Sequence, residues 1–419
     1  MTFSEDELDR LSTAGRLIND AQRSLPVLGT VAWDRSLADQ FFASGEKQLP
    51  KPEYNKIDPA PVFEQLEASR SLIKGTSPVH DWLHRLAYTV ERTARMLSSV
   101  GTQDFYHHSC ALYGNAQTLI ADGDHSALDL ALRLDDLLAD IDECSGFFVP
   151  AEALDANELK TRLDAALPEH FGSEAPDVNV THNVSAKAVA GKSYIKIRED
   201  AKFSEYDVAQ LLQHEALIHV ATGKNGAAQT LFPILGESHP GNARTQEGLA
   251  VFAEYISGAL DPKRFRRLAD RVIAIDMSVE GADFIELYRF FRDKNTNDNP
   301  MEAFESARRV VRGGLTTGGA PFTKDTVYLA GLVEVHSYLR AAVRSRDARY
   351  MRLLFVGKLD LADLKALKML EDMGLLVPPK FVPGWAKDMR FLLSYLAYST
   401  FLNQINMKSV NDRYTDLFS

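Results

Sequence analysis

Apolar positions in the N-terminal part of the chain recur at the spacing of an amphipathic helix. Trp82, Leu86 and Val90 are four residues apart and therefore share one helix face. The segment 127–138 alternates leucines with aspartate and arginine, which gives it the same two-faced character. We therefore expect residues 5–170 to be mostly helical.

A different pattern begins after this region. Val178 and Val180 alternate with polar residues, and the run 194–198 (YIKIR) alternates in the same way, with Gly191 between the two runs. Alternation with a period of two is typical of a strand that is buried on one face. This part of the chain is expected to form a β-hairpin or two neighbouring strands.

Helical spacing returns after Ser204, which forms a weak capping box with Asp207, and continues to the C-terminus. The fold class expected is therefore α+β, predominantly α-helical with one small β-sheet. A length of 419 residues suits two or three domains, or one large core with elaborations. We predict an N-terminal helical region over 1–172 and a second region over 173–419, which can pack as one compact unit.

Composition and charge narrow the functional classes. The chain has 47 Lys and Arg against 58 Asp and Glu, a formal charge of −11, and no long basic stripe, which argues against general nucleic-acid binding. No apolar run approaches the ~20 residues that span a bilayer, and the acidic N-terminus does not resemble a signal peptide. Cys110 and Cys144 stand in no metal or redox spacing. We expect a cytoplasmic protein with reduced thiols and no nucleic-acid or membrane partner.

The segment Gln213–His219 contains two histidines and a glutamate in the order HEALIH. Zinc-binding histidines on a helix are usually four residues apart, or about 40° around the axis, whereas a spacing of five separates them by about 140°. One extra residue, accommodated as a π-bulge, would bring both imidazoles to one ion. The alternative is that His214 points to solvent and His219 to the core.

A second segment, Thr245–Glu254 (TQEGLAVFAE), opens the next helix and offers a third ligand. Glu247 is the carboxylate that such a zinc site needs from elsewhere in the chain, and its surroundings resemble the Asn-Glu-Gly-Phe-Ala stretch of metallo-aminopeptidases. His239, in the preceding loop, is a rival ligand. Glu254 lies on the same helix face about 10 Å farther along the axis, so it is either a support for a ligand or an exposed acid.

Taken together, HEALIH and TQEGLA resemble the family of zinc metallopeptidases that carry HExxxH and QEGLA motifs. A third matching stretch is Arg312–Leu329, and the resemblance covers residues 175–340 most clearly. Bacterial members of the family are mostly of unknown role, and eukaryotic relatives are zinc tyrosine carboxypeptidases that remove the C-terminal tyrosine of α-tubulin. The resemblance implies a gluzincin-like catalytic region over 173–419, with the small sheet next to the zinc-binding helix. It does not imply tubulin as the substrate here.

Roles for individual residues follow from this resemblance and from zinc chemistry. His214, His219 and Glu247 would hold Zn²⁺ and leave a fourth position open. Glu215 would be the general base that takes a proton from water and passes it to the leaving amine. Some related gluzincins carry an acid four residues after the third ligand, where this chain has Val251, so the side chains that orient the histidines must come from elsewhere.

Substrate recognition needs a donor for the oxyanion and a cation for a terminal carboxylate. Tyr328 is the first candidate for the donor and Tyr255 the second. Arg312 and Lys324 flank a glycine-rich segment and are the candidate cations, and Arg244 follows because it precedes the ligand helix.

Two segments also have purely structural interpretations. The glycines within 313–319 are what a helix end and a flexible loop require, so they need not line a peptide pocket. The basic run 263–267 (KRFRR) is interpreted as the solvated start of a helix.

The sequence therefore predicts a zinc metallopeptidase, and most specifically a carboxypeptidase that removes C-terminal residues, tyrosine among them, from peptides or proteins. One alternative is a zinc amidase that acts on a non-protein substrate, because the same metal and base serve any amide. Another is a regulatory protein whose zinc is not catalytic. A structural zinc site is closed by four protein ligands, whereas three are evident here beside a glutamate, which favours catalysis.

Overall fold

The structure is a computed structural model that describes residues 3–120, 122–139, 152–182, 184, 186–294, 299–345, 347–402 and 404–408. Helices make up most of these residues and the sheets are small, which confirms the predominantly α-helical α+β class. None of the described helices has both the length and the apolar character needed to cross a membrane. Cys144 lies outside the described residues, and Cys110 is a free, partly buried thiol.

The α-helices in chain order are α1 (Glu5–Arg23), α2 (Val27–Thr30), α3 (Ser36–Ala43), α4 (Ala60–Leu72), α5 (Pro78–Ser98), α6 (Gln103–Tyr113), α7 (Ala127–Leu137), α8 (Ala156–Phe171), α9 (Glu205–Leu211), α10 (Ala221–Ala227), α11 (Pro240–Ile256), α12 (Pro262–Val279), α13 (Phe284–Lys294), α14 (Pro300–Val311), α15 (Val327–Arg344), α16 (Arg349–Arg352), α17 (Leu364–Asp372), α18 (Gly384–Lys387) and α19 (Arg390–Leu402). The π-helical segment η3 (Leu212–Val220) joins α9 to α10. Short 3₁₀ turns are η2 (Gly172–Glu174), η4 (Pro233–Gly236), η5 (Thr323–Thr326), η6 (Leu353–Phe355) and η7 (Leu361–Asp363).

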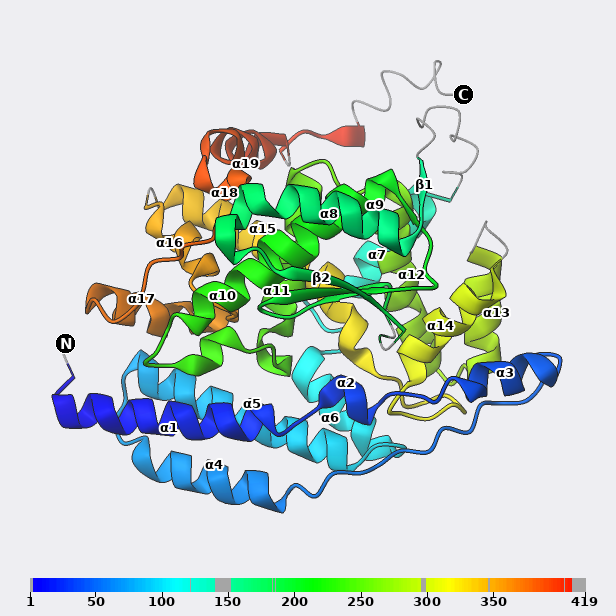
Figure 1. The fold of residues 1–419 in the computed structure, drawn as a ribbon, viewed down its shortest axis with the longest axis horizontal. Coiled ribbons are helices and arrows are strands. Elements are labelled where there is room, and N and C mark those ends of the chain that lie inside the picture. The colour runs from blue at the N-terminus through cyan, green and yellow to red at the C-terminus, as the bar shows by residue number, and fades with distance from the viewer. Residues whose placement is uncertain are drawn as a thin grey trace.

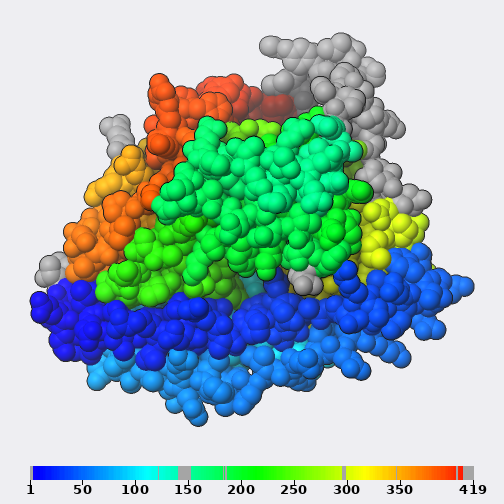
Figure 2. All heavy atoms as spheres, in the orientation of Figure 1, coloured from blue at the N-terminus to red at the C-terminus, as the bar shows by residue number. Residues whose placement is uncertain are grey.

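The N-terminal helices form a layer along one edge of the molecule. In Figure 1, α1, α4 and α5 lie side by side below the rest of the fold, and Figure 2 shows the N-terminal residues as a continuous band on this face. The apolar face predicted for α5 is buried, with Trp82, Leu86 and Val90 each at most 5% exposed. Within this layer, α5 packs against α11.

The predicted strands pair as neighbours but not as a hairpin. In the three-stranded sheet, β2 (Asp177–Thr181) runs parallel to β4 (Tyr194–Arg198), and β3 (Ala188–Ala190) pairs antiparallel with the other side of β4. The connection between β2 and β4 contains β3, so the tight turn at Gly191 joins β3 to β4 instead. A second, two-stranded pairing joins β1 (Ala153–Leu154) to β5 (Phe203–Ser204), directly before α9.

Helices α11 and α15 are packed at very close range. A methyl group at Gly248 would lie 2.2 Å from the backbone carbonyl carbon of Gly331, and one at Gly331 would lie 2.1 Å from the carbonyl oxygen of Arg244. Only glycine permits such an approach of two helix backbones. Helix α11 also packs against η3. The glycine contact with α15 therefore helps to set the distance between α11 and η3.

The helix that follows η3 is tied to the C-terminal part of the chain. The buried Asn225 side chain donates to the carbonyl oxygens of Phe355 and Phe381 at 2.8 and 2.7 Å. Its Oδ1 accepts from the backbone N–H groups of Lys380 and Phe381 at 3.0 and 2.9 Å. One amide side chain of α10 thus satisfies four backbone groups from two distant segments.

Two apolar clusters account for the core. The larger one joins side chains of α1, α5 and α6 to those of α11, α12 and α15, and the smaller one joins α8 to the sheet and to η3. Phe171 and Val178, on either side of the predicted boundary after residue 172, belong to the smaller cluster. The division into regions 1–172 and 173–419 stays a prediction.

The contact at Gly248 generates a test of stability. Changing Gly248 to Ala inserts a methyl group into backbone atoms that cannot move without separating two helices, so we expect a loss of about 1–3 kcal/mol in the free energy of unfolding. Urea unfolding measures this change. Gly384→Ala is the matched control, because nothing lies within 4 Å of its added methyl group. Equal unfolding midpoints for the two variants would contradict the close contact.

Candidate metal centre

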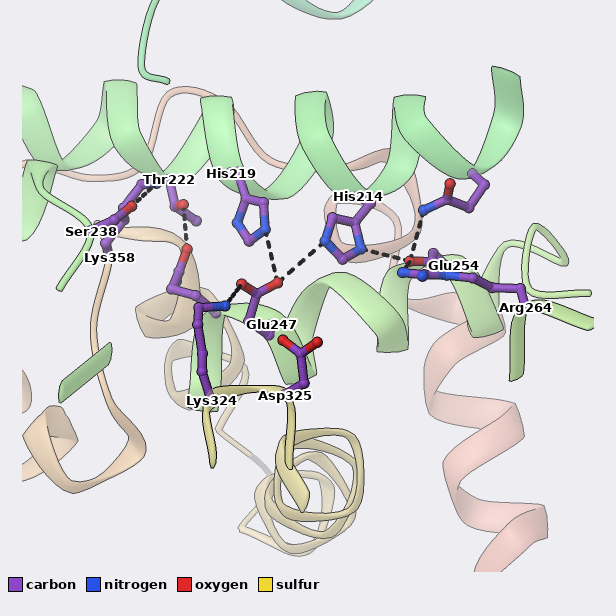
Figure 3. A network of polar contacts seen from close by, with 12 residues as sticks. His214, His219, Thr222, Ser238, Glu247, Glu254, Arg264, Lys324, Asp325 and Lys358 are labelled. Atoms are coloured by element: carbon purple, nitrogen blue, oxygen red, sulfur yellow. Dashed lines mark hydrogen bonds and ion pairs between the residues drawn. The ribbon is translucent and has the colours of Figure 1, made fainter. Parts of the chain in front are cut away.

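The two histidines of the HEALIH segment project from a widened helix. Residues 212–220 form a π-helix, so the five-residue spacing of His214 and His219 completes about one turn. Their ring centroids are 4.9 Å apart. This confirms the predicted wide turn and excludes the alternative in which the two rings face opposite ways. Figure 3 shows both rings pointing from the upper helix toward α11.

Glu247 meets the two rings from α11. Its Oε2 lies 3.4 Å from His214 Nε2 and 3.4 Å from His219 Nε2, and it is buried without a hydrogen-bond donor. One ligand atom from each of the three residues lies within 4.8 Å of the other two. The rival ligand His239 instead caps the start of α11 and is not part of this group of atoms.

The atoms that converge here fit a cation. Glu254 Oε1 accepts a hydrogen bond of 2.6 Å from His214 Nδ1, which leaves the Nε2 lone pair directed at Glu247. The Nε2 atoms of both imidazoles and one carboxylate oxygen thus lie close together, with His214 Nδ1 already engaged by Glu254. Two nitrogens and one oxygen are a donor set that zinc takes in catalytic sites. The residues therefore fit a zinc ion chemically.

The ionisation of these residues agrees with an anionic pocket. Burial opposes the charged imidazole, but hydrogen bonds with Glu247 and Glu254 raise the pKa of His214 well above its usual value. Burial also opposes the Glu247 carboxylate, yet Lys324 and the two histidines hold its pKa well below the usual range. Lys324 Nζ lies 3.1 Å from Glu247 Oε1, so the carboxylate has one oxygen paired and one free for the histidines.

Glu254 is the support for a ligand rather than an exposed acid. It is fully buried, and besides His214 it accepts hydrogen bonds from Gln210 at 3.0 Å and from Arg264 at 3.2 Å. Burial favours its neutral form, but Arg264 and His214 lower the pKa of Glu254 to about 2. It therefore stays ionised and keeps the proton of His214 on Nδ1. Val251 is buried, as its apolar character requires.

A cleft of about 420 Å³ opens beside this cluster. Its lining includes His214 and Glu215 from η3 and Tyr328 from α15, together with residues of β3, α9, α12 and α14. The Tyr328 ring stacks on His214 with centroids 6.4 Å apart. Tyr255 does not line the cleft: it is 46% exposed, and its hydroxyl accepts a hydrogen bond from Tyr395. Of the two tyrosine candidates, the structure brings only Tyr328 to the site.

None of the three cations proposed from the sequence lines the cleft. Arg244 donates to Glu334 at 2.9 Å and to the carbonyl oxygen of Tyr113 at 3.0 Å. Lys324 pairs with Glu247, as described above. Arg312 is buried where α14 ends.

Arginines of α12 and α14 line the cleft instead. This corrects the interpretation of the run 263–267 as solvated for Arg264, whereas Lys263 and Arg267 are exposed as predicted. Arg264, Arg267 and Arg271 follow one face of α12, and Arg309 comes from α14. The side chain of Arg264 is only 13% exposed and is bonded to Glu254. The spacing of three and then four residues along an amphipathic helix is the signal that could have identified this face.

The fold and the site define a class of predominantly helical proteins with a histidine–histidine–glutamate cluster suited to a metal ion. The chain belongs to the microtubule-associated tyrosine carboxypeptidase family, whose model matches residues 39–404. This supports, at the level of the family, the resemblance found in the sequence. A family of carboxypeptidases implies an enzyme whose substrate is a peptide or a protein.

Other comparisons add little. No curated protein matches the sequence of this chain. A crystal structure of a protein from Colwellia psychrerythraea, described as a lipoprotein, is similar with a TM-score of 0.42 and 14% sequence identity. The match covers 75% of this chain and 63% of the length of that protein.

The role of Glu254 leads to a prediction about metal affinity. Glu254→Gln removes the charge that holds the His214 proton on Nδ1, so the affinity for Zn²⁺ should fall about 10–100-fold. Competition with a chromogenic chelator measures this affinity. Glu334→Gln removes a carboxylate outside the cluster and serves as the control. Unchanged affinity in Glu254→Gln would contradict the assigned role.

Proposed function

We propose that the protein is a zinc-dependent carboxypeptidase that removes C-terminal residues, tyrosine among them, from peptides or proteins. The observation that carries the proposal is the buried Oε2 of Glu247, which faces two imidazole nitrogens without a donor. A bound metal ion would take one atom from each of these three residues as a ligand. Membership of a carboxypeptidase family supports the peptide substrate.

His214, His219 and Glu247 are the residues that would hold the ion. A bound Zn²⁺ would supply a Lewis acid that polarises the scissile carbonyl and lowers the pKa of a water molecule toward ~7. Lys324 keeps Glu247 ionised, and Glu254 keeps the Nε2 lone pair of His214 available.

Proton transfer falls to Glu215, which follows His214 directly and lines the cleft. Its carboxylate takes a proton from the attacking water and then delivers it to the amine nitrogen as the peptide bond breaks. Tyr328, also in the cleft, is the proposed donor to the oxygen that becomes negative during attack. Both side chains line the cleft together with His214.

The alternatives from the sequence are less well supported. The metal and Glu215 would serve any amide, so an amidase uses the same residues, but the family match favours a peptide substrate. A closed structural site needs a fourth protein ligand, and the cluster among the described residues has three beside an open cleft.

Metal content is the first test of the proposal. The purified protein should bind about one Zn²⁺ per chain, and His214→Ala or His219→Ala should abolish this binding because each removes one of three ligands. Elemental analysis after gel filtration measures the content. His239→Ala, which changes the histidine that caps α11, should retain the metal. Full zinc content in the first two variants would refute the ligand assignment.

Turnover tests the role of Glu215. Glu215→Gln keeps the shape of the side chain but cannot accept the proton, so kcat should fall by at least about 100-fold while zinc content and the unfolding midpoint stay unchanged. Release of C-terminal tyrosine from a synthetic peptide, followed by mass spectrometry, measures the rate. Activity close to that of the unmodified protein would rule out the hydrolytic mechanism.

A further inference from the structure

Two arginines of the cleft, Arg267 and Arg271, have no hydrogen-bond acceptor among the described residues, and Arg271 is the less exposed of the two. Arg271, on α12, lines the cleft and is 18% exposed. Its nearest carboxylate is Asp325, whose Oδ2 lies 3.7 Å from Arg271 Nε, beyond hydrogen-bonding distance. Both oxygens of Asp325 accept hydrogen bonds of 2.8 Å from Arg309 instead. Within the described residues, the donors of Arg271 therefore remain available.

The charge of Arg271 is poorly compensated by the carboxylate nearest to it. Asp325 pairs with Arg309, and Lys324 pairs with Glu247, so neither carboxylate serves Arg271 alone. Burial and the neighbouring Arg309 lower the pKa of Arg271 to about 9, which reflects a guanidinium that is poorly compensated. An arginine remains protonated at neutral pH all the same. A bound anion would restore the balance.

The position of Arg271 relative to the histidines suits a substrate terminus. Tyr328 stacks on His214, and its hydroxyl is close enough to both Arg271 and Arg309 to affect the pKa of each guanidinium. Arg271 and Glu215 line the same cleft. In a carboxypeptidase substrate the terminal carboxylate is one residue, at most about 3.6 Å of chain, beyond the scissile carbonyl. The anion site must therefore lie in the same cleft as the catalytic groups, and Arg271 lines that cleft.

We propose that Arg271 binds the terminal α-carboxylate of the substrate through its unpaired guanidinium donors. The proposal rests on the proposed carboxypeptidase function and names the residue that makes the site an exopeptidase site. Asp325 takes part as a positioning residue, because it binds Arg309 on both oxygens and holds Arg271 only through charge. An arginine–carboxylate pair of this kind is frequently bidentate, and this geometry rejects an uncharged amide.

A binding experiment tests this without requiring turnover. The Zn²⁺-loaded Glu215→Gln protein is titrated with two fluorescein-labelled hexapeptides that end in tyrosine, one with a free carboxylate and one with a carboxamide. The free acid should bind about 30-fold or more tightly, because the amide loses a charge-assisted contact and leaves Arg271 unpaired. Adding Arg271→Met should bring the two affinities within about threefold, and Arg271→Lys should give an intermediate ratio because lysine cannot bind with two parallel donors.

Arg267→Met is the matched control. Arg267 precedes Arg271 by one helical turn, lines the same cleft and is more exposed, so its loss changes the charge of the cleft by the same amount. The control should weaken the binding of both peptides alike and keep their ratio. If the Arg271→Met protein still binds the free acid more tightly than the amide by the original ratio, the proposal is overturned. This holds even if hydrolysis by the unmodified protein establishes the carboxypeptidase function. Equal affinities for the two peptides in the parent protein also overturn it.

Discussion

A buried carboxylate oxygen that faces two imidazole nitrogens is the constraint on which the rest of the site depends. Glu247 Oε2 accepts no hydrogen bond, and the charge of this carboxylate is compensated by a chain of neighbouring side chains. Lys324 neutralises the other oxygen, and Glu254 directs the proton of His214 away from Glu247. Arg264 in turn neutralises Glu254. Because each charge is paired with the next, the cluster tolerates burial that a single carboxylate would not.

The helices are shaped to bring these atoms together. A regular α-helix would turn His214 and His219 about 140° apart, and the π-helical segment removes that divergence. The approach of Gly248 to Gly331 brings α11 against α15, in the turn that also carries Glu247. The widened turn of η3 and the glycine packing of α11 together set the distances of 3.4 Å between Glu247 Oε2 and the Nε2 atoms of the two histidines. The alignment is built into the backbone and does not depend on flexible side chains.

Features encoded by short-range patterns could be predicted from the sequence. The helices follow from apolar spacing, and the wide turn follows from two histidines five residues apart that must serve one ion. The parallel pairing of β2 with β4 could not be predicted, because alternation gives a strand but not its partner's direction. The sequence alone leaves two alternatives for Glu254, because its role depends on how close α11 lies to η3. Arg264 belongs to a charged run that resembles a solvated surface, and Arg271 follows on the same helix. Only the packing of α12 places both side chains at the cleft.

The π-helical segment also affects residues beyond the histidines. One additional residue rotates all later side chains of the same helix about the helix axis. Asn225 is eleven residues after His214 and bonds the backbone around Phe355 and Phe381. Loss of one residue from η3 would rotate Asn225 by about 100° relative to His214 and direct its amide away from those segments. The length of the HEALIH segment is thus shared by two functions, ligand alignment and attachment of the C-terminal segments. Evolution could shorten it to the usual four-residue spacing only by rebuilding both ends of the helix at once.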